Sequence, residues 1–112
     1  MTVLLVDDDK SSLTLLRLHL VRDGCDVSAT LDPREGLRLL QERSYDCLVV
    51  DGQMGPIDGF ALAGLAKELH PDIRVAMVSG VYERDDIAGS AVDRLFQKPV
   101  DPDALARYVR MI

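Results

Sequence analysis

Five polar residues, of types that can bind metal ions or phosphoryl groups, each follow closely on a short apolar run. Two are adjacent carboxylates near the N-terminus, a third carboxylate lies near the middle, and the others are a hydroxyl and an amine. They are Asp7, Asp8, Asp51, Ser79 and Lys98. If the apolar runs are strands of one parallel sheet, these side chains meet at one edge of it.

The three carboxylates of this set would repel one another, and their pKa values would rise, unless a cation lay between them. Mg²⁺ suits such oxygen ligands and is usually held by one or two carboxylates together with water. Lys98 would add a positive charge and Ser79 a hydrogen-bond donor. Together these groups favour phosphoryl transfer, in which Asp51 could itself be the nucleophile.

The elements that must position these residues are short strands and the helices between them. Five runs rich in Val, Leu and Ile predict strands buried on both faces. They comprise residues 3–6, 25–29, 47–50, 73–78 and 95–96.

Helical patterns occupy the segments between and after these runs. Four of them begin at capping signals, which are Ser11 or Ser12, Asp32 before Pro33, Asp58, and Asp101 before Pro102. A further helix is expected within residues 83–90, where the apolar stripe is thin. Strand and helix thus alternate five times, which predicts an α/β fold with a doubly wound parallel sheet and helices on both faces.

Composition limits the class of protein. A chain of 112 residues, 47% hydrophobic and 29% charged, predicts one globular domain, residues 1–112. No apolar run approaches the roughly 20 residues that span a bilayer, and no signal peptide is evident, so we expect a cytoplasmic protein without membrane contact. The net charge of −6 argues against direct nucleic-acid binding. Cys25 and Cys47 are expected to be reduced core thiols.

Four stretches carry a family resemblance over essentially the whole chain. They are "LLVDDDK", "LVVDGQMGPIDG" with Asp51, "VAMVSG" with Ser79, and "FQKPVDPDAL" with Lys98. Their order and spacing resemble the receiver domain of two-component response regulators, the CheY-like family. The resemblance implies a flavodoxin-like five-stranded sheet in the order 2-1-3-4-5 with five helices.

The resemblance also implies a division of roles around magnesium. Asp51 would accept a phosphoryl group from a histidine kinase or phosphotransfer protein. Asp8 and Asp51 would bind Mg²⁺ directly, with the backbone carbonyl of Gln53 as a third ligand. Asp7 would act through a metal-bound water, and Asp9 would serve only as a turn or capping residue.

Ser79 and Lys98 would contact the phosphoryl group, and the Lys98-Pro99 peptide bond would be cis. Phosphorylation would then alter the face formed by the last two helices and the strand between them, where a downstream effector protein or domain binds. Such a chain modifies itself and is not a conventional enzyme. Two positions depart from the family pattern: Gly55 where proline is usual, and Leu95 where the switch aromatic usually lies.

Two alternatives stay open from the sequence. One is an aspartate-nucleophile phosphatase of the haloacid-dehalogenase type, which would use Asp7 and Asp9 and leave Asp51 without a role. The other is a degenerate receiver that acts only as a protein-interaction module, which the departures at Gly55 and Leu95 favour.

Overall fold

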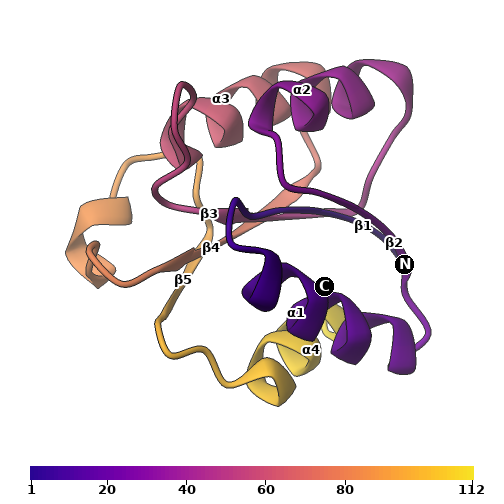
Figure 1. The fold of residues 1–112 in the computed structure, drawn as a ribbon. Coiled ribbons are helices and arrows are strands. Elements are labelled where there is room, and N and C mark those ends of the chain that lie inside the picture. Colours follow the sequence, from indigo (N-terminus) through magenta and orange to yellow (C-terminus); the bar gives the residue numbers. More distant parts are fainter.

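The computed structural model describes residues 1–112 and alternates strands with helices along the whole chain (Figure 1). The strands are β1 (Thr2–Val6), β2 (Asp26–Thr30), β3 (Cys47–Asp51), β4 (Arg74–Ser79) and β5 (Arg94–Gln97). The α-helices are α1 (Lys10–Arg22), α2 (Pro33–Glu42), α3 (Gly59–Leu69) and α4 (Pro102–Arg110), and a single 3₁₀ turn, η1 (Arg84–Ile87), connects β4 to β5.

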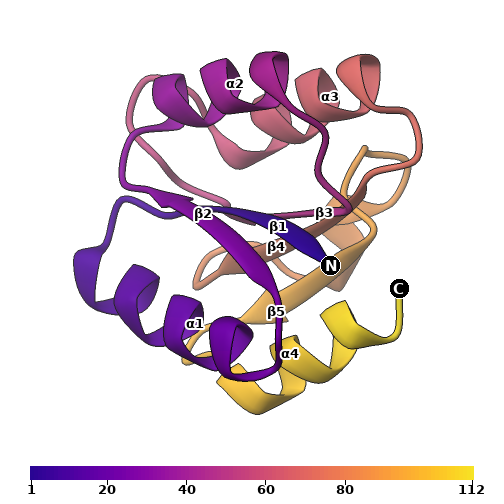
Figure 2. The same cartoon turned by 90° about the vertical axis from the view of Figure 1, so that its right-hand side faces the viewer.

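The five strands form one parallel sheet in the order β2-β1-β3-β4-β5. Helices α2 and α3 cover one face, and α1 and α4 cover the other (Figure 2). This arrangement confirms the predicted α/β fold, and the strand order confirms the flavodoxin-like topology that the resemblance implied. The order reverses between β1 and β3, so the predicted binding edge lies at the carboxyl ends of these strands.

Both faces of the central strands are buried, as their continuous apolar runs predict. In β1, Leu4 and Val6 belong to the core beneath α2 and α3, whereas Val3 and Leu5 belong to the core beneath α1 and α4. Every residue of β3 is buried. β3 therefore ends in Asp51 after a run of buried apolar residues.

Capping side chains begin the four helices where the sequence predicts, with one correction. Asp32, Asp58 and Asp101 each accept hydrogen bonds from backbone N–H groups in the first turn of the helix that follows. The first helix is capped by Asp9, whose carboxylate accepts from the Ser11 N–H, so the expected cap at Ser11 or Ser12 is wrong. Asp9 thus has the capping role expected of it.

The fifth helix expected within residues 83–90 is not formed; the chain has four α-helices and the 3₁₀ turn η1 in its place. Ile87 is the only residue of this turn that packs against the core beneath α2 and α3. Gly89 then adopts a positive φ of 75° and ends the turn. A helix needs several apolar side chains on one face to offset its nucleation cost, and this short connection does not supply them.

Three further features bear on the sequence expectations. Cys25 and Cys47 are buried free thiols, as expected, and burial raises the pKa of Cys47 to about 12.

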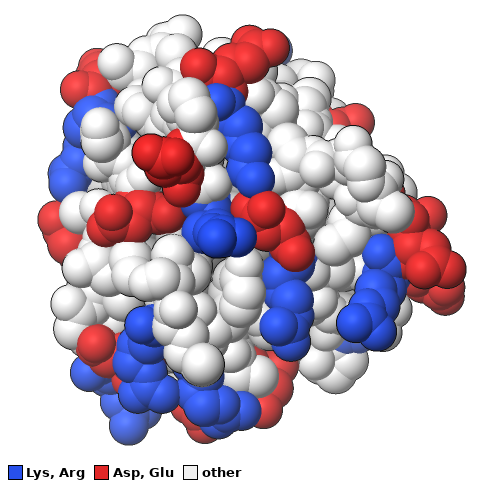
Figure 3. Space-filling model, turned by 180° about the vertical axis from the view of Figure 1, so that it is seen from behind, with Lys and Arg blue, Asp and Glu red and all other residues white.

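None of the helices combines the length and the apolar character that crossing a bilayer requires. On the face shown in Figure 3, acidic and basic side chains are intermingled, so this face has no extended basic surface.

Candidate phosphoacceptor and metal site

The predicted site residues lie at the carboxyl edge of the sheet. Asp7 and Asp8 directly follow β1, and Asp51 and Ser79 are the last residues of β3 and β4. Lys98 directly follows β5, where its backbone N–H donates to the carbonyl of Ser79 at 2.9 Å. Four neighbouring strands therefore bring the residues together, as the spacing in the sequence predicts.

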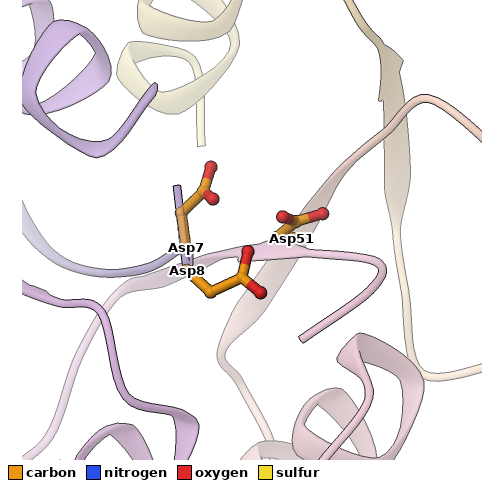
Figure 4. A group of neighbouring side chains, drawn as sticks. All are labelled: Asp7, Asp8 and Asp51. Carbon is orange, nitrogen blue, oxygen red and sulfur yellow. The ribbon is translucent and has the colours of Figure 1, made fainter. Parts of the chain in front are cut away.

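Three carboxylates form the centre of the site (Figure 4). Asp7, Asp8 and Asp51 each offer an oxygen atom, and these atoms lie within 4.8 Å of one another. Asp7 and Asp51 are buried, with 1% and 5% of their surface exposed, whereas Asp8 is exposed to solvent. Two acids are therefore held close together at the inner side of the cluster while the third faces water.

Asp7 is under the greatest electrostatic strain of the three. Burial raises its pKa to about 6, and the facing carboxylate of Asp51 adds to the shift, while the backbone N–H of Asp9 and the charge of Lys98 oppose it. The Asp9 N–H donates to Oδ1 of Asp7 at 2.9 Å. The other oxygen, Oδ2, is buried and has no hydrogen-bond partner. A buried carboxylate oxygen left in this way is costly unless a cation or water reaches it.

Asp51 also contacts the positively charged side chain of Lys98. The Nζ atom of Lys98 lies 3.3 Å from Oδ2 of Asp51, and the Lys98 side chain is 32% exposed. The other oxygen, Oδ1, accepts the backbone N–H of Gln53 at 3.3 Å. Asp51 thus contacts the Lys98 ammonium group and lies beside Asp7 and Asp8. The Lys98-Pro99 peptide bond is cis, as the resemblance implied.

Glycine allows the start of α3 to approach the end of β3 closely. A Cβ atom at Gly59 would collide with the backbone carbonyl of Asp51. The Gly59 N–H donates to the carbonyl of Gly52 at 3.2 Å. The loop between β3 and α3 is therefore tied to the end of β3 where α3 begins, although Gly55 in the middle of the loop adopts a positive φ of 40°.

A hard divalent cation fits this cluster. Three carboxylates converge there, one oxygen of Asp7 is buried without a partner, and Asp8 keeps an open side toward water. Mg²⁺ requires oxygen ligands and retains several waters, which the exposed side can supply. The ligand role of the Gln53 carbonyl stays a prediction. Asp9 lies outside the cluster because its carboxylate caps α1.

The sequence argument missed the aromatic residues beside the site. Tyr82 comes three positions after Ser79, and its ring packs against that of Phe60 in the first turn of α3, with centroids 4.9 Å apart. A Cβ atom at Gly52 would lie 3.0 Å from the Tyr82 ring. The chain has only five aromatic residues, and two of them flank predicted site loops. The position of these two aromatic residues beside the predicted site loops was the feature of the sequence that could have indicated their contact.

Comparisons with known proteins agree with this fold. The family described as "Response regulator receiver domain" matches residues 3–110. The transcriptional regulatory protein GlrR of Escherichia coli K12 is 33% identical over 110 residues, which cover 96% of this chain and 25% of GlrR. An uncharacterised protein of Leptolyngbya boryana is 34% identical over 98% of this chain and 88% of its own length.

Solved structures show the same architecture. The receiver domain of the Francisella response regulator 1452 superposes with a TM-score of 0.89 at 26% identity, covering 98% of this chain and 93% of that one. An α/β sheet of this order, with an acidic site at the carboxyl edge and a family match over nearly all residues, defines a class of signalling domain. The chain belongs to the response regulator receiver domain family.

Proposed function

We propose that this chain is a phosphorylatable receiver of a two-component or phosphorelay system and that Asp51 is its phosphoacceptor. The observation that carries the proposal is the position of Asp51, with Lys98 Nζ at 3.3 Å on one side and two further carboxylates within 4.8 Å. Groups arranged in this way neutralise and orient a phosphoryl group, which is most of what phosphoryl transfer requires from a protein.

In the transfer step, a carboxylate oxygen of Asp51 attacks phosphorus on a phosphohistidine of a histidine kinase or phosphotransfer protein. A new P–O bond forms as the P–N bond breaks, and the leaving imidazole takes up a proton. Lys98 pairs with the charge on the transferred phosphoryl group, and the Ser79 hydroxyl donates a hydrogen bond to it. The product is an aspartyl phosphate.

Asp8 and Asp51, with the Gln53 carbonyl, would hold Mg²⁺, and Asp7 would bind through a water molecule. When bound, Mg²⁺ neutralises phosphoryl oxygens and the negative charge of the cluster. The unpartnered Oδ2 of Asp7 supports this assignment because it offers an acceptor for a metal-bound water.

The resulting change would reach η1, β5 and α4, the face on which a downstream effector protein or domain would bind. Receiver domains act in this way as switches and not as conventional enzymes with turnover of a separate substrate. The phosphoryl group acts as the ligand that shifts the population between two conformations.

The phosphatase alternative loses support from the geometry. It requires Asp7 and Asp9 to act together, but the Asp9 carboxylate accepts from the Ser11 N–H and the Ser12 hydroxyl at 3.2 and 3.0 Å. Asp51, which that mechanism would leave without a role, is a member of the acidic cluster.

Intact-mass measurement with acetyl phosphate and Mg²⁺ tests the proposal. We expect one labile phosphoryl adduct on the wild type, none on Asp51→Asn, and none on the wild type when Mg²⁺ is removed by a chelator. Asp46→Asn is a matched control at the opposite edge of the sheet and should keep the adduct. A wild type that gains no adduct would favour the degenerate receiver, whereas an adduct that persists in Asp51→Asn would exclude Asp51 as the acceptor.

A further inference from the structure

Tyr82 connects the candidate site to the first turn of α3. Its ring meets Phe60 in an edge-on arrangement, with centroids 4.9 Å apart and an angle of 79° between the planes. On its other side the ring lies so close to Gly52 that a Cβ atom there would be 3.0 Å from Cδ2 of Tyr82. Gly52 directly follows Asp51. Tyr82 is thus in contact with both the phosphoacceptor loop and α3.

The Ser79 hydroxyl holds the backbone of Tyr82. Its Oγ atom accepts the N–H groups of Val81 and Tyr82, each at 3.0 Å. Ser79 is almost fully buried, with 1% of its surface exposed. The oxygen that would contact the phosphoryl group is therefore the same atom that fixes the start of the β4–η1 loop.

The usual family position for a switch aromatic does not have one in this chain. Leu95 occupies it and packs against the core beneath α2 and α3. The neighbouring Phe96 points to the opposite core, where its ring meets Tyr108 with centroids 5.7 Å apart. The chain therefore has two edge-on aromatic pairs on opposite faces of the sheet, and in the Phe60–Tyr82 pair the Tyr82 N–H donates to the side-chain hydroxyl of Ser79.

We propose that Tyr82 follows the Ser79 hydroxyl when Asp51 is phosphorylated, and that the resulting change in the packing of Tyr82 on Phe60 transmits the signal to the start of α3. This inference rests on the proposed function. It assigns to Tyr82 the part that Leu95 cannot perform, and it adds the first turn of α3 to the surface that responds.

The physical reason lies in the two N–H groups on Ser79. If Oγ turns toward a phosphoryl oxygen, the Val81 and Tyr82 N–H groups lose their acceptor unless the loop follows it. Both hydrogen bonds are partly buried, and losing their common acceptor would be unfavourable, so the loop follows Oγ. Because the Tyr82 ring is already against Gly52, its movement must be taken up at the contact with Phe60.

Fluorine NMR on protein labelled with 3-fluorotyrosine tests the inference. The chain has three tyrosines, at positions 45, 82 and 108, so each resonance can be assigned from a Tyr→Phe variant. Beryllofluoride with Mg²⁺ serves as the phosphoryl probe, and its own bound fluorine signal reports occupancy of the site in the same spectrum. We expect the Tyr82 resonance to shift on binding. An unchanged Tyr82 resonance while bound beryllofluoride is visible would overturn the inference.

Ser79→Ala separates transmission through the hydroxyl from a direct effect of the nearby probe. Because Ser79 also contacts the phosphoryl group, this variant should bind the probe more weakly, so beryllofluoride is raised until its bound fluorine signal matches that of the wild type; the Tyr82 shift should then be absent. A Tyr82 shift that survives the substitution would overturn the inference, because the probe would then act on the ring without Ser79. Absence of any bound beryllofluoride in the wild type would instead overturn the proposed function, and with it this inference.

The two aromatic pairs provide a matched control that does not depend on Ser79→Ala. If phosphorylation alters the Phe60–Tyr82 contact, then altering the contact must change the affinity for the probe by the same coupling. We expect Phe60→Leu to change the dissociation constant of beryllofluoride by about fivefold and Phe96→Leu by less than about twofold. Equal effects of the two substitutions would overturn the inference.

Discussion

Acidic side chains lie at both edges of the sheet, but their surroundings are opposite. At the amino edge, Asp46 accepts both the N–H and the hydroxyl of Thr2, at 2.8 and 2.9 Å. At the same edge, both carboxylate oxygens of Asp93 accept hydrogen bonds from Nζ of Lys67, at 2.9 and 2.8 Å. Oδ2 of Asp93 also accepts the Val75 N–H at 2.9 Å. Each of these carboxylates is well supplied with donors.

At the carboxyl edge, the acids face one another. One oxygen of Asp7 accepts a single N–H, and the other is buried without a partner. Asp51 accepts only two long hydrogen bonds, from the Gln53 N–H and from Nζ of Lys98, each at 3.3 Å. Carboxylates at the amino edge thus stabilise the fold, whereas the burial of Asp7 beside Asp51 is unfavourable unless a cation neutralises the pair. This difference is what a binding site for a hard cation requires.

The largest expected effect is that the two edges respond to pH with opposite sign. Burial raises the pKa of Asp7 from 3.8 to about 6, so between these values the folded state binds more protons than the unfolded state. The stability that Asp7 contributes by binding a proton in the folded state is present at pH 4 and is lost as pH rises through about 6. The free energy of unfolding of the metal-free protein should fall by roughly 3 kcal/mol over this range. Urea unfolding of the wild type and Asp7→Asn between pH 4 and 7 measures this as the difference between the two curves.

Asp46 provides the comparison for that experiment. Hydrogen bonds from Thr2 lower the pKa of Asp46, so its contribution is present above its ordinary pKa and lost as pH falls. The difference between the wild type and Asp46→Asn should therefore stay nearly constant between pH 4 and 7 and shrink below pH 4, whereas the difference for Asp7→Asn changes between pH 4 and 7. Parallel curves for the wild type and Asp7→Asn across this range would contradict the assignment of strain to Asp7.

The second prediction concerns the same substitutions at a fixed pH. At pH 7 without metal, Asp7→Asn should raise the free energy of unfolding by about 2 kcal/mol, because it removes a buried charge and its amide can donate to Asp51. Asp46→Asn should lower it by about 1 kcal/mol, because an amide accepts less strongly from Thr2. Chemical denaturation measures both. Destabilisation by Asp7→Asn would show that the acidic cluster is not strained.

The contrast between the edges also explains what the sequence could predict. Strand ends and helix starts follow from local patterns, so the placement of Asp7, Asp51, Ser79 and Lys98 at one edge could be predicted. The capping role of Asp9 also followed from its position after a strand. A family resemblance was needed for the strand order, since alternation alone fits more than one doubly wound topology.

Features that depend on packing between distant segments could not be predicted. The expected helix within residues 83–90 fails because its stability depends on contacts with the sheet, which Ile87 alone supplies. The unpartnered oxygen of Asp7 depends on how distant segments pack around it, and the contact of Tyr82 with Gly52 depends on a glycine that leaves room for the ring. No periodicity in the sequence records such contacts.

The third prediction concerns the binding of Mg²⁺ at the carboxyl edge. Mg²⁺ that binds only the folded state should raise the free energy of unfolding by about 1.4 kcal/mol at ten times its dissociation constant. Asp8→Asn should reduce this gain, since Asp8 is the predicted direct ligand, whereas Asp93→Asn should leave the gain unchanged despite its own cost. Thermal unfolding with and without Mg²⁺ measures the effect. An equal gain in the wild type and Asp8→Asn would exclude Asp8 as a ligand.

The smallest expected effect compares the two lysines that pair with acids. Lys98 faces Asp51 at 3.3 Å and Lys67 faces Asp93 at 2.8 Å, and both lysine side chains are about one-third exposed. Without metal, Lys98→Met and Lys67→Met should each lower the free energy of unfolding by about 1 kcal/mol, a value between those of exposed and buried pairs.

Magnesium should separate the two variants. A cation beside Asp51 supplies the positive charge that Lys98→Met removes, so at saturating Mg²⁺ the cost of this substitution should fall by about half or more. Lys67 is at the opposite edge, and the cost of Lys67→Met should not change. Urea unfolding of the two variants and the wild type in both conditions gives this as a double difference. An equal effect of Mg²⁺ on the two variants would mean that the ion does not bind beside Asp51, because only a local charge can replace one lysine and not the other.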